Sequence, residues 1–201
     1  MLKISPRINE EKEDTHLLNN EMSEDSPIKD ALYEKIKNIG EKQIHQLLLN
    51  GNFSELFERI CEPVIHHIKS IEEYEKYGTI AESVTHYLFT EMLIPSQRKI
   101  SFKNIELDII IPNLDELQKN NHNAIVILFA KTPNNIQLKQ RIEEIKKIQN
   151  VDSNIWIISK DSLNISQSTY IIEKYSFSDF LKDAQNFVKT KKMNKLNIFK
   201  T

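Results

Sequence analysis

Four charged residues in the middle of the chain are the strongest candidates for chemistry, namely Glu82, Glu106, Asp108 and Lys131. Carboxylate oxygens are the ligands that hard cations such as Mg²⁺ prefer. A cation held in this way can activate water and neutralise charge that develops on a phosphate. Glu82 and Lys131 are far from Glu106 and Asp108 in the sequence, so the four form a site only if the fold brings their secondary-structure elements together.

The periodicity of apolar residues predicts those elements. Between residues 78 and 94 the apolar residues recur at helical spacing, and after Pro95 the period changes to two, with many β-branched residues. The expected elements are a helix opened by Gly78-Thr79, strands over 99–102 and 105–111 joined by a turn at Lys103-Asn104, a buried strand over 124–130, an amphipathic helix over 136–149 and a short buried strand over 154–159. The predicted order is helix, three strands, helix and strand.

Alternation along the strands predicts which side chains share a face. Residues two apart in a strand point to the same side, about 7 Å apart at ~3.3 Å per residue. Glu106 and Asp108 should therefore share a face of the second strand, and Phe129 and Lys131 a face of the third.

These residues, in this element order, resemble the PD-(D/E)XK nuclease superfamily, which includes type II restriction enzymes and archaeal Holliday junction resolvases. The resemblance covers residues 77–175 and matches Glu82 to the family's helix glutamate, Asp108 to its strand aspartate and Lys131 to its lysine. It implies an α/β fold with a restriction-endonuclease-like core and a Mg²⁺- or Mn²⁺-dependent endonuclease that hydrolyses DNA. Asp108 and Glu82 would hold the metal, and Lys131 would position the attacking water.

The chain departs from the family motif at one position, because Phe129 stands where the family has its second acid. Loss of this carboxylate should lower metal affinity unless another acid replaces it. Glu106 is the first candidate for that replacement, and Glu143 or Glu144 is a weaker one. The alternative for Glu106 is an ordinary carboxylate paired with a lysine across the hairpin. The alternative for the protein is a catalytically inactive nuclease fold that binds nucleic acid or a protein partner.

Residues 26–75 are predicted to form an N-terminal helical region. Ser26-Pro27 begins a helix that extends to Leu48, and a second helix with Pro63 inside it follows Asn50-Gly51-Asn52. The segment 36–51 also resembles a helix-hairpin-helix, a module whose backbone N–H groups grip phosphates. The alternative for that segment is a plain helix with Gly40 inside it.

The remaining segments complete the predicted organisation. Residues 1–25 are expected to be a disordered acidic tail, residues 76–190 the nuclease-like domain and residues 191–201 a basic tail. Within that domain a strand is expected over 169–175, and Ser176 or Ser178 should cap a last helix. The net charge of −2 combines an acid-rich beginning with a lysine-rich end, so it does not argue against a DNA partner.

Other patterns exclude several classes of function. The three glycines are isolated, so there is no glycine-rich phosphate loop, and no histidine or cysteine has zinc-ligand spacing. Cys61 is expected to be a buried core thiol. No apolar run reaches the roughly 18 residues of a membrane helix, so we expect a cytoplasmic protein without a membrane partner. A homodimer and a protein partner on the N-terminal helices are further expectations.

Overall fold

The computed structural model describes the backbone of residues 26–197 and the side chains of residues 26–191. The predicted acidic tail, residues 1–25, lies outside the described residues. The fold is mixed α/β, with an open five-stranded sheet in the order β1-β2-β3-β4-β5. The helices are α1 (Pro27–Ile39), α2 (Glu41–Leu49), α3 (Phe53–His67), α4 (Glu73–Glu91), α5 (Leu114–Lys119), α6 (Asn135–Lys146) and α7 (Lys174–Asn197). The strands are β1 (Gln97–Phe102), β2 (Ile105–Ile111), β3 (Ile125–Phe129), β4 (Ile155–Ser159) and β5 (Ser168–Ile171).

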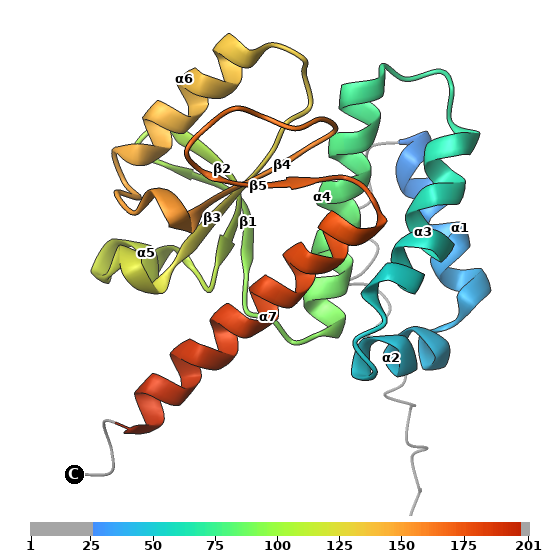
Figure 1. The fold of residues 1–201 in the computed structure, drawn as a ribbon, viewed down its shortest axis with the longest axis horizontal. Helices are drawn as coiled ribbons and strands as arrows, with labels where there is room; N and C mark the ends of the chain where they lie inside the picture. Colours follow the sequence, from blue (N-terminus) through green and yellow to red (C-terminus); the bar gives the residue numbers. More distant parts are fainter. Residues whose placement is uncertain (1–25, 198–201) are drawn as a thin grey trace, which may run out of the picture.

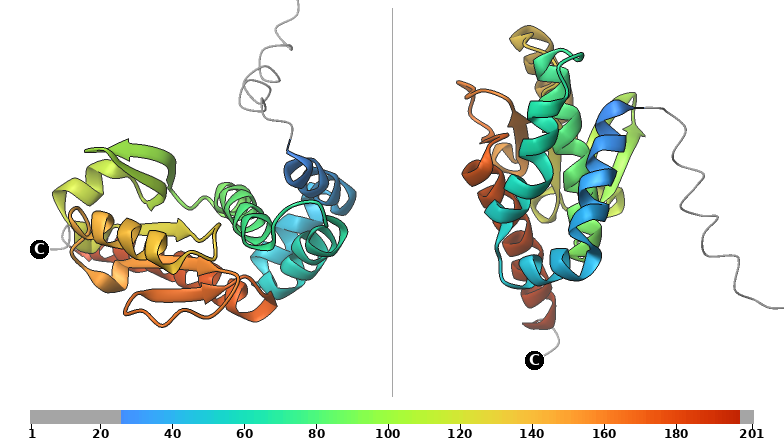
Figure 2. Two further views of the ribbon diagram at one scale, coloured as in Figure 1. Left: turned by 90° about the horizontal axis from the view of Figure 1, so that it is seen from above. Right: turned by 90° about the vertical axis from the view of Figure 1, so that its right-hand side faces the viewer.

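The sheet separates two hydrophobic cores. One core lies between the sheet and α4 and α7, and it continues into α1, α2 and α3. The other lies between the opposite face of the sheet and α5 and α6. Figures 1 and 2 show α4 between the sheet and the three N-terminal helices, so α4 is buried on two sides.

The predicted element order is present between α4 and β4. β1, β2 and β3 pair antiparallel, and β3 and β4 pair parallel because α6 carries the chain back across the sheet. Lys103 and Asn104 form the predicted hairpin turn, and both have positive φ. The sequence did not predict α5, which lies between β2 and β3.

The N-terminal helices differ from the prediction of one helix through residue 48. Gly40 has a φ of 82° and separates α1 from α2, a conformation that glycine adopts without steric cost. Asn38 lies within α1 and Gly40 alone joins α1 to α2, so the segment is two helices with a one-residue link rather than a plain helix. α3 is continuous through Pro63.

The C-terminal elements begin and end differently from the prediction. β5 ends at Ile171, and α7 begins at Lys174, before either predicted capping serine. The Ser176 hydroxyl instead accepts a hydrogen bond from the Ile171 N–H. The backbone of α7 continues to Asn197 and so crosses the predicted boundary between residues 190 and 191. No helix in the described chain is long and apolar enough to cross a bilayer.

Gly78 does not open α4, as the sequence suggested, but lies in its second turn. The helix begins at Glu73, and the Glu72 side chain caps it by accepting hydrogen bonds from the N–H groups of Tyr74 and Glu75. A Cβ on Gly78 would lie 2.7 Å from Lys131 Cγ and 3.0 Å from the Ala130 carbonyl oxygen. Glycine is required here because α4 crosses the end of β3 at close range.

We predict that Gly78→Ala destabilises the protein by about 1–3 kcal/mol through overpacking, although alanine is the better helix former by about 1 kcal/mol. The free energy of unfolding in urea measures this change. Thr79→Ala, one residue along the helix, is the control and should change stability by less than about 1 kcal/mol. The cost should shrink in a Lys131→Ala background, which removes the nearest atom. A stabilised Gly78→Ala protein would contradict the close approach.

Cys61 lies in the core of the N-terminal helices with 1% of its surface exposed. Burial raises the pKa of its thiol, with a smaller contribution from the Glu62 carboxylate. Because the thiolate is the reactive form, we predict that a thiol reagent at pH 8 leaves the native protein unlabelled and labels it once in urea. Fast labelling of the native protein would show that this core opens.

Candidate functional site

Asp108 lies where β2 separates from β3. The ladder between these strands covers the pairs Ile109–Ile127, Ile110–Val126 and Ile111–Ile125. Beyond it, Asp108 Oδ2 accepts a hydrogen bond of 2.9 Å from the N–H of Phe129. Phe129 is buried, so its N–H would have no acceptor without the Asp108 carboxylate. The carboxylate therefore accepts the hydrogen bond that a backbone carbonyl would accept if the ladder continued.

The regular alternation of β2 is interrupted at the same residue. Leu107 and Ile110 belong to the core on the α6 side of the sheet, whereas Ile109 belongs to the opposite core. On the neighbouring strand, Lys99 has a positive φ of 51° and is missing from the β1–β2 register. Because the alternation of side chains between the two faces of β2 is interrupted here, it does not place the Glu106 and Asp108 side chains on one face of the strand.

Arg141 on α6 holds the second oxygen of Asp108. One guanidinium nitrogen lies 2.9 Å from Asp108 Oδ1, and the side chains of Arg141 and Asp108 are 36% and 20% exposed. This partner was not predicted from the sequence. Its position was a usable signal, because Arg141 lies three residues after Leu138 and four before Ile145, beside the stripe of α6 that packs on the sheet.

Lys131 and Glu82 form a second ion pair. Lys131 Nζ lies 2.5 Å from Glu82 Oε2, and the glutamate side chain is only 13% exposed. The close approach of α4 at Gly78 brings these two residues together. This pair comes from the α4 side of the sheet, whereas Arg141 reaches Asp108 from the α6 side.

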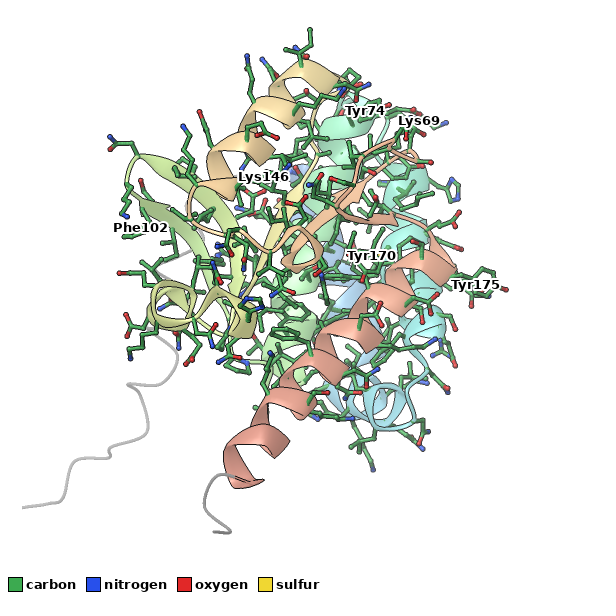
Figure 3. All side chains as sticks on the ribbon, turned by 60° about the vertical axis from the view of Figure 1, so that its left-hand side comes forward. Lys69, Tyr74, Phe102, Lys146, Tyr170 and Tyr175 are labelled. Carbon is green, nitrogen blue, oxygen red and sulfur yellow. The ribbon has the colours of Figure 1, made fainter. Side chains whose placement is uncertain are left out.

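The start of α4 is fixed by the chain that follows β4. Lys160 pairs with Glu73 at 2.8 Å, and the hydroxyl of Tyr74, a residue that Figure 3 labels, hydrogen-bonds to Asp161. The bond to Lys160 lowers the pKa of Glu73, and the bond to Asp161 raises the pKa of Tyr74. These exposed contacts set the position of the helix rather than adding much stability.

The other predicted acids do not join either pair. Glu106 is exposed, and its register partner on β1 is Ser101 rather than a lysine. Glu143 pairs with Lys146 on its own helix. Phe129 is 1% exposed and belongs to the core beneath α4 and α7.

The donor set does not fit the divalent cation that the resemblance implies. Both oxygens of Asp108 already accept a donor, Lys131 neutralises Glu82, and a phenyl ring stands at position 129. Across the described residues, no group of three or more His, Cys, Asp or Glu residues could hold a metal ion. Of the predicted site residues, the structure thus brings together only Glu82 and Lys131, while Asp108 pairs with Arg141 and Glu106 joins neither pair.

Comparisons with protein-family models, with curated proteins and with solved structures found no match to this chain. The relation to the PD-(D/E)XK nucleases therefore stays a prediction.

We predict that Asp108→Ala lowers the free energy of unfolding by about 1–3 kcal/mol, because it leaves the buried Phe129 N–H without an acceptor. Asp108→Asn should cost less, since an amide oxygen can still accept that bond. Glu106→Ala on the same strand is the control and should stay within about 0.5 kcal/mol of the parent. Urea unfolding measures all three. Equal effects of Asp108→Ala and Glu106→Ala would mean that the carboxylate does not hold the strands.

Proposed function

We propose that this protein is a catalytically inactive nuclease-like module that binds nucleic acid without hydrolysing it. One observation carries the proposal. The three residues that match the nuclease motif are engaged in the ion pairs Glu82–Lys131 and Asp108–Arg141 rather than in a shared cluster of carboxylates.

The element order supports a nuclease-like ancestry. A helix, an antiparallel hairpin, a third antiparallel strand, a crossover helix and a parallel strand follow one another from α4 to β4. The helix carries Glu82, the second strand carries Asp108, and Lys131 follows the third strand. Glu82 and Asp108 thus lie on the kinds of element that the resemblance implies, whereas Lys131 lies two residues beyond the end of β3.

The environment of Asp108 supports the loss of hydrolysis. A metal bound there would have to compete with Arg141 for one oxygen and with the Phe129 N–H for the other. Displacing the Phe129 N–H would leave a buried donor without a partner, which costs about 1–3 kcal/mol, whereas the partly exposed Arg141 guanidinium could turn to water.

Charge supports an anionic partner. Residues 1–25 hold seven acidic and three basic side chains, so the rest of the chain carries two more positive than negative charges. Lys131 and Arg141 are each more than a third exposed at the site. Separately, α7 carries Lys189 and Lys191, of which Lys189 is exposed. Such clusters attract phosphates in a salt-dependent way.

A second candidate function is docking of a protein partner on the N-terminal helices. Tyr33 on α1 and Leu49 at the end of α2 are 62% and 87% exposed, although both are large apolar residues. In this case the sheet would be only a scaffold. The predicted homodimer is one form that such docking could take.

We predict that the purified protein with Mg²⁺ or Mn²⁺ leaves single-stranded, duplex and branched DNA intact. It should bind labelled DNA in fluorescence anisotropy, with an affinity that falls as salt rises. Lys189→Glu/Lys191→Glu should weaken binding and flatten the salt dependence, since each lost phosphate contact removes about 0.9 from the slope of the logarithmic plot. Lys37→Glu/Lys42→Glu on α1 and α2 is the matched control.

Two results would overturn the proposal. Metal-dependent cleavage that Asp108→Ala and Lys131→Ala abolish, but Glu106→Ala does not, would make the protein an enzyme. An absence of DNA binding even at low salt would favour the protein-docking function instead.

A further inference from the structure

A pocket of about 540 Å³ lies between the tip of the β1–β2 hairpin, the end of α5 and the end of α6. None of the motif residues lines it. Its walls are formed by Phe102, Lys103, Leu117, Gln118, Lys119, Asn120, Asn121, Lys147 and Ile148. Its size is in the range of small-molecule sites, roughly 300–1,000 Å³.

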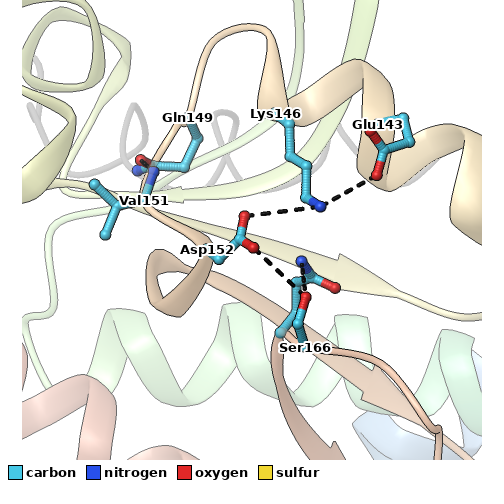
Figure 4. Close-up of polar contacts among 7 residues, drawn as sticks. Glu143, Lys146, Gln149, Val151, Asp152 and Ser166 are labelled. Carbon is cyan, nitrogen blue, oxygen red and sulfur yellow. Dashed lines mark hydrogen bonds and ion pairs between the residues drawn. The ribbon is translucent and has the colours of Figure 1, made fainter.

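The charge in this pocket has one sign. Lys103, Lys119 and Lys147 come from three different elements, and no acidic residue lines the pocket. All three are exposed, and none makes an ion pair with any side chain of residues 26–191. Neighbouring Lys146 is different, because it lies between Glu143 and Asp152 (Figure 4). Three ammonium groups without carboxylate partners indicate a site for an anion with more than one charge.

The wall next to these lysines is held in place by side-chain amides, of which Gln149 is buried. Gln149 is fully buried, and its amide nitrogen donates to the carbonyl oxygens of Asn121 and Ala124. Asn154 also donates to the Asn121 carbonyl, and the Asn121 side chain donates to Asn150. The pocket is therefore built on a fixed framework rather than on a loose loop.

The pocket also offers neutral donors and apolar surface. The Asn120 side-chain oxygen accepts from the His122 N–H, so its NH₂ group keeps its donors for a ligand. Phe102 is half-buried beside the hairpin turn, where Figure 3 labels it, and Ile148 is half-buried at the end of α6. Lys103 Nζ lies 5.1 Å from the centre of the Phe102 ring, so cation and aromatic surface are adjacent.

We propose that this pocket binds a nucleotide, with its phosphates at Lys103, Lys119 and Lys147 and its base against Phe102 and Ile148. Clustered lysines suit phosphate oxygens, and an aromatic ring suits the flat face of a base. The nucleotide is either a free molecule or one unit of a single-stranded nucleic acid. The inference does not depend on the proposed function, because the pocket shares no residue with the two ion pairs.

Isothermal titration calorimetry of the full chain with ATP and with inorganic phosphate, together with anisotropy of a labelled eight-nucleotide oligo(dT), tests the proposal. We expect at least one of the two probes, ATP or the oligonucleotide, to bind at low salt. That probe should have a higher affinity for the protein than inorganic phosphate has. Lys119→Gln/Lys147→Gln should weaken that binding about tenfold or more. Phe102→Leu should reduce the ratio of the affinity for that probe to the affinity for inorganic phosphate. Lys37→Gln/Lys42→Gln, which neutralises two exposed lysines on the N-terminal helices, should change nothing.

The two probes separate the sources of the nucleotide. If ATP binds and Lys119→Gln/Lys147→Gln weakens its binding, the ligand is a free nucleotide. If only the oligonucleotide binds and the same variant weakens its binding, the ligand is a nucleic-acid chain. The proposal is overturned if neither probe binds, or if Lys119→Gln/Lys147→Gln affects binding no more than the control. Thermal unfolding followed by circular dichroism checks that the variants are folded. DNA binding that depends on Lys189 and Lys191 but not on the pocket would leave the proposed function intact.

Discussion

The hydrogen bond from the Phe129 N–H to the Asp108 carboxylate determines how the middle of the sheet is built. A ladder of backbone bonds joins β2 to β3 for three residue pairs and then stops. At that point one side-chain oxygen continues the pattern, and the hairpin is free to leave the plane of the sheet. The tip of the hairpin can then reach the ends of α5 and α6, where it forms one wall of the lysine-lined pocket.

A second constraint acts on the opposite face of the sheet. α4 lies so close to the end of β3 that a side chain at position 78 would collide with Ala130 and Lys131. This approach brings Glu82 within reach of Lys131. It also buries α4 between the sheet and the N-terminal helices, so the packing of both halves of the chain depends on the same helix.

The sequence was most informative where apolar periodicity is strong, and least where a contact is made across the fold. The runs of residues in β2, β3 and β4 predicted buried strands, and the order of elements followed from them. The sequence predicts that Gly78 opens a helix, because its packing role depends on a neighbouring strand that the sequence alone does not place beside it. α5 was missed because six residues with a single buried leucine carry almost no periodic signal.

Arg141 was missed for a related reason. A charged residue in an amphipathic helix is usually taken to face solvent, and only the fold places this one beside Asp108. Without Arg141, the carboxylates alone suggested a cluster able to attract a cation.

The two ion pairs change which ligands this edge of the sheet can attract. Glu82 and Asp108 carry two negative charges, and Lys131 and Arg141 carry two positive ones. A divalent cation needs an excess of carboxylate charge, which the family motif supplies at the position that Phe129 occupies here. With a phenyl ring at position 129, these four side chains have no net formal charge, so they supply no excess negative charge to hold a metal or to repel a phosphate. Glu82 and Asp108 are therefore each matched to a cation of their own, Lys131 and Arg141, and no third carboxylate stands at position 129.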